Sequence, residues 1–210
     1  MFKTINQNVS AEIVEKKSKF IANVFYVETQ EEAEEKVKEI KKKYFDARHN
    51  CYAFSVFTKE GVINRFSDDG EPSGTAGSPM LNILNSKEIT NVVVVVTRYF
   101  GGILLGTGGL VRAYTGALQE ALSQVEEICK DIGLEVKLQT TYQDLEKLKY
   151  YLKQNQIDIT NMQYNEIVEV FVDITEEKYN NILSAKEKYE LNFELIRTEI
   201  LKEKYIRIEK

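Results

Sequence analysis

Several residue types are scarce in this chain of 210 residues, and each scarcity excludes a class of protein. With only two prolines and 43% hydrophobic residues, the chain is neither disordered nor rich in linkers. Its two cysteines, Cys51 and Cys129, lie far apart and match no metal-binding or redox spacing. There is a single histidine, His49. We therefore expect a globular protein of a reducing compartment, without a resident metal or cofactor.

Long apolar runs are also missing. No stretch approaches the roughly 18 uncharged apolar residues that a membrane span requires. The first residues lack the apolar run of a signal peptide. These absences predict a cytoplasmic protein without a membrane partner, and the length fits one large or two ordinary domains.

The net charge of -5 is unevenly distributed along the chain. Residues 1–125 carry 15 basic and 15 acidic side chains, whereas residues 126–210 carry 13 basic and 18 acidic ones. A broadly basic nucleic-acid binder is thereby excluded, and any polyanion must be held by a local patch. Four of the six arginines fall between residues 48 and 112: Arg48, Arg65, Arg98 and Arg112.

Hydrophobic periodicity predicts the elements of the first half. In chain order they are a hairpin over residues 8–27, a helix over 31–44, strands over 51–57 and 62–66, a helix through 80–84, a strand over 92–96 and a helix over 110–122. The strand over residues 92–96 consists of five valines without polar alternation. Such a run is typical of a central strand buried on both faces.

The second half follows a different pattern. It predicts strands over residues 134–141, 157–164, 167–174 and 191–201, helices over 143–154 and 176–189, and a polar tail. The order β-α-β-β-α-β is that of the split ferredoxin-like motif. We place the domain boundary near the change in charge, which gives an N-terminal domain of residues 1–130 and a C-terminal domain of residues 131–210.

A glycine-rich segment lies between the valine strand and the following helix. It contains Gly101, Gly102, Gly106, Gly108 and Gly109. A strand, a glycine turn and a helix are a layout in which backbone N–H groups and a helix N-terminus hold an anion. The segment is not a P-loop, because Thr107 stands in place of the lysine, nor a dinucleotide fingerprint, because Val111 stands in place of the third glycine.

Two interpretations of this segment stay open. In the first, its five glycines, with Arg98 at the strand end and Arg112 one turn into the helix, bind a phosphate or nucleic acid. In the second, the glycines allow a tight turn and close packing, and the two arginines pair with Asp69 or Glu71.

The loop of residues 68–77 is a second candidate. Asp68, Asp69 and Glu71 are the hard oxygen ligands that a divalent cation prefers, but the EF-hand pattern is absent. Turn formation and helix capping by Ser73 or Thr75 are the favoured interpretation. A long polar loop on a compact domain also fits a recognition surface.

Single side chains offer less. His49, beside Arg48, lacks a nucleophile that spacing alone can identify, so a structural histidine is favoured over a general base. Cys51 is interpreted as a small core residue. The aromatic residues Tyr99, Phe100 and Tyr114 are of the type that stacks on bases, although such residues more often belong to a core.

Several motifs resemble those of the YigZ/IMPACT family and together cover about residues 17–120. They are KSKFIA from Lys17, ARHNCYA from Ala47, DDGEPSGTAG from Asp68, VVTRYFGG from Val95 and LGTGGLVRAY from Leu105. The resemblance implies an α+β protein of two domains. The N-terminal domain would have the left-handed β-α-β fold shared by a small-subunit ribosomal protein domain, elongation factor G domain IV and GHMP kinases. The C-terminal domain would be ferredoxin-like.

The resemblance also implies a role in translation. The eukaryotic members are translational regulators that bind the general-control coactivator on ribosomes, a partner that is itself eukaryotic. We hypothesise a non-enzymatic protein that binds RNA or the ribosome through Arg98, Arg112 and the glycines, and that modulates translation, also under stress. Adjacent surface residues would be Arg48, His49, Asp68, Asp69, Glu71, Ser73 and Thr75. The alternatives are an enzyme acting on a phosphorylated metabolite or nucleotide at Gly101–Gly109, and a protein-binding adaptor that docks through residues 68–72.

Overall fold

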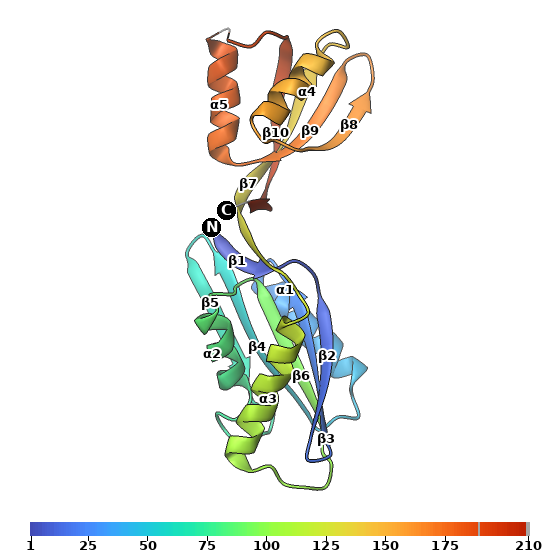
Figure 1. The fold of residues 1–210 in the computed structure, drawn as a ribbon, viewed down its shortest axis with the longest axis vertical. Helices are drawn as coiled ribbons and strands as arrows, with labels where there is room; N and C mark the ends of the chain where they lie inside the picture. Colours follow the sequence, from blue (N-terminus) through green and yellow to red (C-terminus); the bar gives the residue numbers. More distant parts are fainter. Residues whose placement is uncertain (189, 209–210) are drawn as a thin grey trace. The chain divides into compact units, whose positions relative to one another are not determined.

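The structure is a computed structural model that describes residues 1–188 and 190–208. Spatial contacts divide the chain into two units, Phe2–Cys129 and Lys130–Lys210, with Met1 in the second. Each unit combines helices with a β-sheet (Figure 1). The predicted α+β class with two domains is therefore confirmed.

The first unit contains six strands and three helices. They are β1 (Phe2–Ile5), β2 (Val9–Glu15), β3 (Ser18–Tyr26), α1 (Gln30–Lys43), β4 (His49–Thr58), β5 (Gly61–Ser67), α2 (Gly77–Ser86), β6 (Val92–Tyr99) and α3 (Gly106–Leu122). Five of the strands form an antiparallel sheet in the order β2-β3-β6-β4-β5. The valine strand is thus central, and the side chains of Val92–Val96 are fully buried, as predicted.

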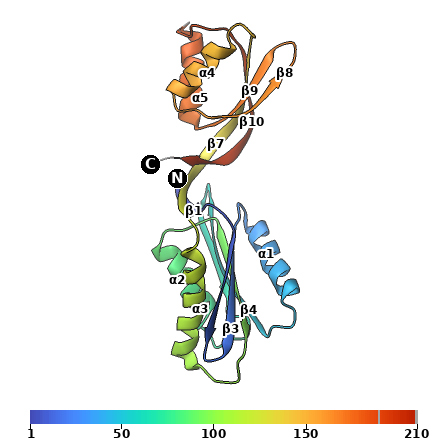
Figure 2. The same cartoon turned by 45° about the vertical axis from the view of Figure 1, so that its right-hand side comes forward.

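Helices cover both faces of this sheet. Successive side chains of β6 point to opposite sides, so its consecutive valines make both faces apolar. Val92, Val94 and Val96 belong to the core that contains α2 and α3. Val93 and Val95 pack instead with the apolar stripe of α1. Figure 2 shows α1 on one face of the sheet and α2 and α3 on the other.

The short strand β1 was not predicted. It pairs with strand β7 (Glu127–Thr140). In addition, the amide of Thr90 donates to the carbonyl of Lys3, at 2.8 Å, and the amide of Asn6 donates to the carbonyl of Glu126, at 3.0 Å. Four residues are too few to establish an alternating pattern, so periodicity could not identify this strand.

The second unit has the β-α-β-β-α-β order that its sequence predicts. Its elements are β7 (Glu127–Thr140), which spans the division between the units, α4 (Leu145–Gln154), β8 (Ile159–Tyr164), β9 (Val168–Ile174), α5 (Glu176–Glu187) and β10 (Leu195–Ile208). The strand order β10-β7-β9-β8 is that of the split ferredoxin-like motif. The polar tail predicted after residue 201 was wrong for residues 202–208, because β10 continues to Ile208, and residues 209–210 lie outside the described residues. In this part of β10 the exposed side chains are those of Lys202, Glu203 and Arg207.

No helix in the described ranges is long and apolar enough to cross a membrane.

Antiparallel pairing brings several connections to one end of the first unit. Lys19 pairs with Tyr99, His49 pairs with Arg98, and Tyr52 pairs with Ser67. We call this end the loop end, and define it as the β2–β3 turn (residues 16–17), the α1–β4 connection (44–48), the loop 68–76, the segment 100–105 and the first turn of α3. It lies at the lower end of the ribbon in Figure 1.

Candidate functional site

A buried ion pair lies at the centre of the loop end. Nη1 of Arg98 is 2.7 Å from Oε1 of Glu71, and the two side chains are 8% and 3% exposed. The hydroxyl of Tyr114 donates to the same oxygen at 2.8 Å. One carboxylate thus joins the end of β6, the loop before α2 and the middle of α3.

Arg98 therefore takes the role of an internal partner of Glu71, the second of the two interpretations of its sequence. Its guanidinium also lies between two aromatic rings, with Cζ at 5.6 Å from the ring centre of Phe20 and 5.5 Å from that of Phe100. Nε of Arg98 is buried without a hydrogen-bond partner among the described atoms. The positive charge of Arg98 is consequently compensated inside the protein.

The carboxylates of the loop 68–76 bond to backbone and side-chain donors of the same unit. Oδ1 of Asp68 accepts from the amides of Ala76 and Gly77 at 3.0 and 2.8 Å, and Oδ2 accepts from Gly74 at 2.8 Å. Asp69 accepts from the amide of Asn50 at 2.7 Å and from Nζ of Lys41 at 2.6 Å. Within the described ranges no group of three or more His, Cys, Asp or Glu side chains is arranged to hold a metal ion.

These bonds correct the predicted helix cap. The residue preceding α2 is Ala76, which offers no side-chain cap. Thr75 donates instead to the carbonyl of Pro72, at 2.6 Å, and Ser73 is exposed. Asp68 instead accepts hydrogen bonds from the amides of Ala76 and Gly77 at the start of the helix, and its position eight and nine residues before them is not one at which a cap is expected.

His49 and Cys51 are tied to the same loop. Nδ1 of His49 lies 2.9 Å from the carbonyl of Asp69, so that nitrogen carries the proton. Sγ of Cys51 donates to the carbonyl of Asp68 at 3.0 Å. Burial raises the pKa of the Cys51 thiol to about 12. Cys51 is therefore protonated near neutral pH and is not a reactive nucleophile.

Two glycines of the segment 101–109 serve its shape in different ways. A Cβ at Gly101 would collide with the backbone of Lys17. Because glycine has no Cβ, the segment can lie directly against the β2–β3 turn. The amide of Gly101 also donates to Oγ of Ser18, at 3.1 Å. Gly102 has φ +86°, a conformation that favours glycine.

The helix after this segment starts earlier than predicted. Residues 106–109 belong to the first turn of α3 rather than to the glycine turn, and Gly106 has φ +71°. No side chain caps this N-terminus; Gly106 and Gly108 are exposed, whereas Gly109 is buried. A Cβ at Gly108 would lie 3.7 Å from Nη1 of Arg112, so this guanidinium stands beside the exposed first turn.

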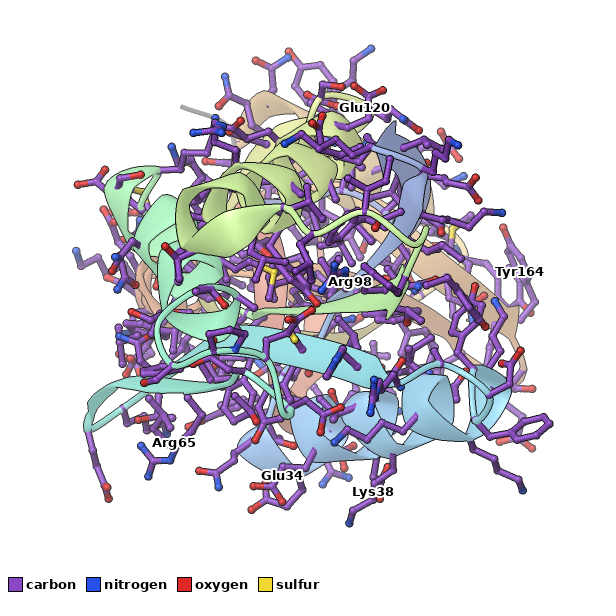
Figure 3. The ribbon with its side chains drawn as sticks, turned by 90° about the horizontal axis from the view of Figure 1, so that it is seen from below. Glu34, Lys38, Arg65, Arg98, Glu120 and Tyr164 are labelled. Atoms are coloured by element: carbon purple, nitrogen blue, oxygen red, sulfur yellow. The ribbon has the colours of Figure 1, made fainter. Side chains whose placement is uncertain are left out.

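Four basic side chains at or beside the loop end remain exposed: Lys16, Lys17, Arg48 and Arg112. In the described part of the chain none of them lies within 4.0 Å of a carboxylate, whereas Asp69 and Glu71 have cationic partners. Figure 3 looks onto this end, with Arg98 near its centre and Arg65 apart at the periphery. The four arginines between residues 48 and 112 therefore do not form one patch, because Arg98 is buried and Arg65 belongs to the edge strand β5.

Lys16 and Lys17 were not among the predicted site residues, although they lie within the hairpin predicted over residues 8–27. Both have positive φ, at 44° and 65°, as the tight β2–β3 turn requires. The exposed apolar residues Phe45 and Leu104 were not singled out either, although they are 84% and 83% exposed. The sequence shows this pair of lysines within a predicted hairpin, which was the available signal. The sequence does not show that the pair lies next to Gly101 in the folded protein.

The fold and the loop end together define a class of protein. Its members are two-domain α+β proteins in which a glycine-rich connection between a strand and a helix lies next to a buried Arg–Glu ion pair. Residues 16–122 match the Impact N-terminal domain, and residues 138–185 match a domain of unknown function, DUF1949. The chain belongs to the IMPACT family, as its motifs predict.

The relatives with matching sequences include bacterial proteins of similar length. The chain is 39% identical to the IMPACT family member YvyE of Bacillus subtilis, over 86% of this chain and 82% of that protein. It is 40% identical to the IMPACT family member YigZ of Escherichia coli, over 73% of this chain and 76% of that protein. A crystal structure of a hypothetical protein matches all of this chain and 98% of its own, with a TM-score of 0.64 and 32% identity.

Proposed function

We propose that this protein binds RNA, free or within the ribosome, through its loop end, and thereby modulates translation in the cytoplasm. The observation that carries the proposal is the set of four exposed cations without carboxylate partners, Lys16, Lys17, Arg48 and Arg112, at the end of the unit where α3 begins without a side-chain cap. Phosphates are bound by such cations and by free N–H groups at helix termini. Membership in the IMPACT family supports the link to translation.

The proposal divides the predicted site residues into two groups. Arg112 and the backbone of the exposed residues Gly106 and Gly108 would contact phosphates, together with Lys16, Lys17 and Arg48. Arg98 and Glu71 would hold the connections in place without touching the ligand, because both side chains are buried. His49, Asp68, Asp69 and Thr75 would likewise maintain the loop 68–76 through the bonds described above.

The other two hypotheses have weaker support. An adaptor that docks through residues 68–72 would present its acidic side chains, but Asp68, Asp69 and Glu71 already bond inside the unit. An enzyme that holds a phosphorylated metabolite would use the same exposed first turn of α3. A thermal-shift screen of nucleotides and sugar phosphates distinguishes this possibility, because a ligand that binds the folded state raises its apparent stability.

Salt dependence gives the direct test. Each contact to a single-stranded phosphate contributes about -0.7 to the slope of log K against log salt concentration. Four contacts predict a slope of about -2.8, and hence about a 50-fold loss of affinity between 50 and 200 mM salt. We would measure the fluorescence anisotropy of a labelled 20-nucleotide RNA with the full chain.

Arg112→Ala should weaken binding and make the salt slope about 0.7 shallower. The matched control is Lys153→Ala, which removes an exposed cation from α4 of the other unit. Absence of binding at 50 mM salt, or affinity that does not change with salt, contradicts the proposal. Equal effects of the two substitutions would place the binding surface elsewhere.

A further inference from the structure

The aromatic residues of the loop end differ sharply in what they offer to a ligand. Tyr114 is fully buried, packs edge-on against Phe20 with ring centres 5.1 Å apart, and donates its hydroxyl to Glu71. The hydroxyl of Tyr99 donates to Asp46 at 2.7 Å, and this bond raises the pKa of Tyr99 to about 12. Phe100 is 54% exposed. Of the three aromatics that the sequence singles out, only Phe100 presents a large free surface.

The position of Phe100 is determined by buried groups. The guanidinium of Arg98, fixed by its ion pair with Glu71, lies over the ring of Phe100 at 5.5 Å and over that of Phe20 at 5.6 Å. Such cation–π contacts orient a ring, and here they involve a cation that is only 7% exposed. Phe100 is therefore an oriented platform beside a buried ion pair, and more than half of its surface still faces solvent.

Exposed apolar side chains, and cations without carboxylate partners, lie at the same end of the unit as this platform. Ile103 and Leu104, in the same segment as Phe100, are 42% and 83% exposed. The segment lies against the β2–β3 turn, which carries Lys16 and Lys17. The approach is so close that a Cβ at Gly101 would collide with the backbone of Lys17. This surface combines cations that have no carboxylate partner with an exposed aromatic ring. It therefore complements a polyanion that carries planar groups free to stack on that ring.

We propose that the loop end binds single-stranded segments of RNA by stacking an unpaired base on Phe100 while the surrounding cations hold the phosphates. This inference rests on the proposed function and names the form of RNA that the site takes. In a duplex the bases are already stacked inside the helix and cannot reach the ring. In a single strand every base has a free face, and stacking on an aromatic side chain is tolerant of sequence.

The chain contains no tryptophan, which permits a direct optical test. Phe100→Trp introduces the sole tryptophan at the platform, and its fluorescence should be quenched when a 12-nucleotide single-stranded RNA binds. A 12-base-pair RNA duplex should leave the fluorescence nearly unchanged at equal occupancy. The control is Tyr164→Trp on β8 of the other unit, a position of 56% exposure where RNA should not quench the fluorescence.

Removal of the ring provides the affinity test. Phe100→Ala should lower the affinity for the single strand about 5- to 140-fold and that for the duplex less than 2-fold. Tyr164→Ala should change neither affinity. Thermal unfolding of each variant is recorded in parallel, and Phe100→Leu, which keeps an apolar side chain without a π face, separates stacking from loss of packing. We expect Phe100→Leu to bind the single strand nearly as weakly as Phe100→Ala.

The outcomes separate this inference from the proposed function. If Phe100→Ala binds the single strand as tightly as the unaltered protein while Arg112→Ala binds it weakly, the stacking is wrong and phosphate binding stands. If the unaltered protein binds neither RNA at 50 mM salt, both are overturned. Binding to phosphatidylserine vesicles that depends on Phe100, without RNA binding, would assign the surface to an anionic membrane and contradict both.

Discussion

Removal of the Glu71 carboxylate should destabilise the first unit strongly. Glu71→Ala leaves the Arg98 guanidinium charged and buried, and takes away the acceptor of the Tyr114 hydroxyl. Breaking a buried ion pair from one side costs about 3–5 kcal/mol. Solvent screens this ion pair little, since the side chains of Arg98 and Glu71 are 8% and 3% exposed. At about 1.4 kcal/mol per factor of ten, the equilibrium constant for opening should rise about 140- to 4,000-fold.

Cys51 is a natural reporter of this opening. Its side chain is fully buried within the same unit, so a thiol reagent reaches it only when the unit opens. We would measure the labelling rate of Cys51 in a Cys129→Ser background, under conditions in which reclosing is faster than labelling. The control is Glu35→Ala, at an exposed position of α1, which should change stability by less than about 0.5 kcal/mol.

A double variant tests the physical reason. If the cost arises from an uncompensated buried charge, Glu71→Met combined with Arg98→Met should be milder than Glu71→Ala alone, because no charge remains in the core. Labelling of Glu71→Ala less than 10-fold faster than that of the control would refute the reasoning. A double variant that is at least as unstable as the single one would assign the loss to packing rather than to charge.

The remaining predictions concern a titration and two glycines. Because burial raises the Cys51 pKa from 9.0 to about 12, the unfolded state loses this proton first as the pH rises. Stability should therefore fall between about pH 9 and 12, by up to about 1.4 kcal/mol per pH unit. Cys51→Ala should make that slope shallower in urea unfolding; an unchanged slope contradicts the assignment. Gly101→Ala should destabilise the first unit by about 3 kcal/mol or more, because the new Cβ meets the Lys17 backbone. Gly102→Ala meets no atom within 4 Å and should cost only about 1–2 kcal/mol of left-handed strain, so equal midpoint shifts in thermal unfolding would disprove the distinction.

The elements themselves were largely predictable because their signals are local. Five consecutive valines identified the central strand, β6, and alternation with turn residues identified the order of the ferredoxin-like unit. The signals failed where they were short or polar. β1 has four residues, and the end of β10 exposes mostly polar side chains that look like a tail.

The site was only partly predictable. The glycines and arginines were recognised as a group, but Arg98 and Arg112 have the same chemistry and opposite environments. One is buried against Glu71, and the other is exposed beside Gly108. The difference arises from side-chain direction and from a partner 27 residues away, and neither is encoded in the spacing of a motif.

By itself, the sequence determined the class, the family motifs, the division of charge and the residues from which a polyanion site can be built. Those properties depend on composition and on contacts between near neighbours. The tertiary structure decided which of those residues face a ligand. It buried Arg98, Glu71 and Tyr114 together and brought Lys16, Lys17 and Phe100 to one end, because antiparallel register joins strands that are distant along the chain.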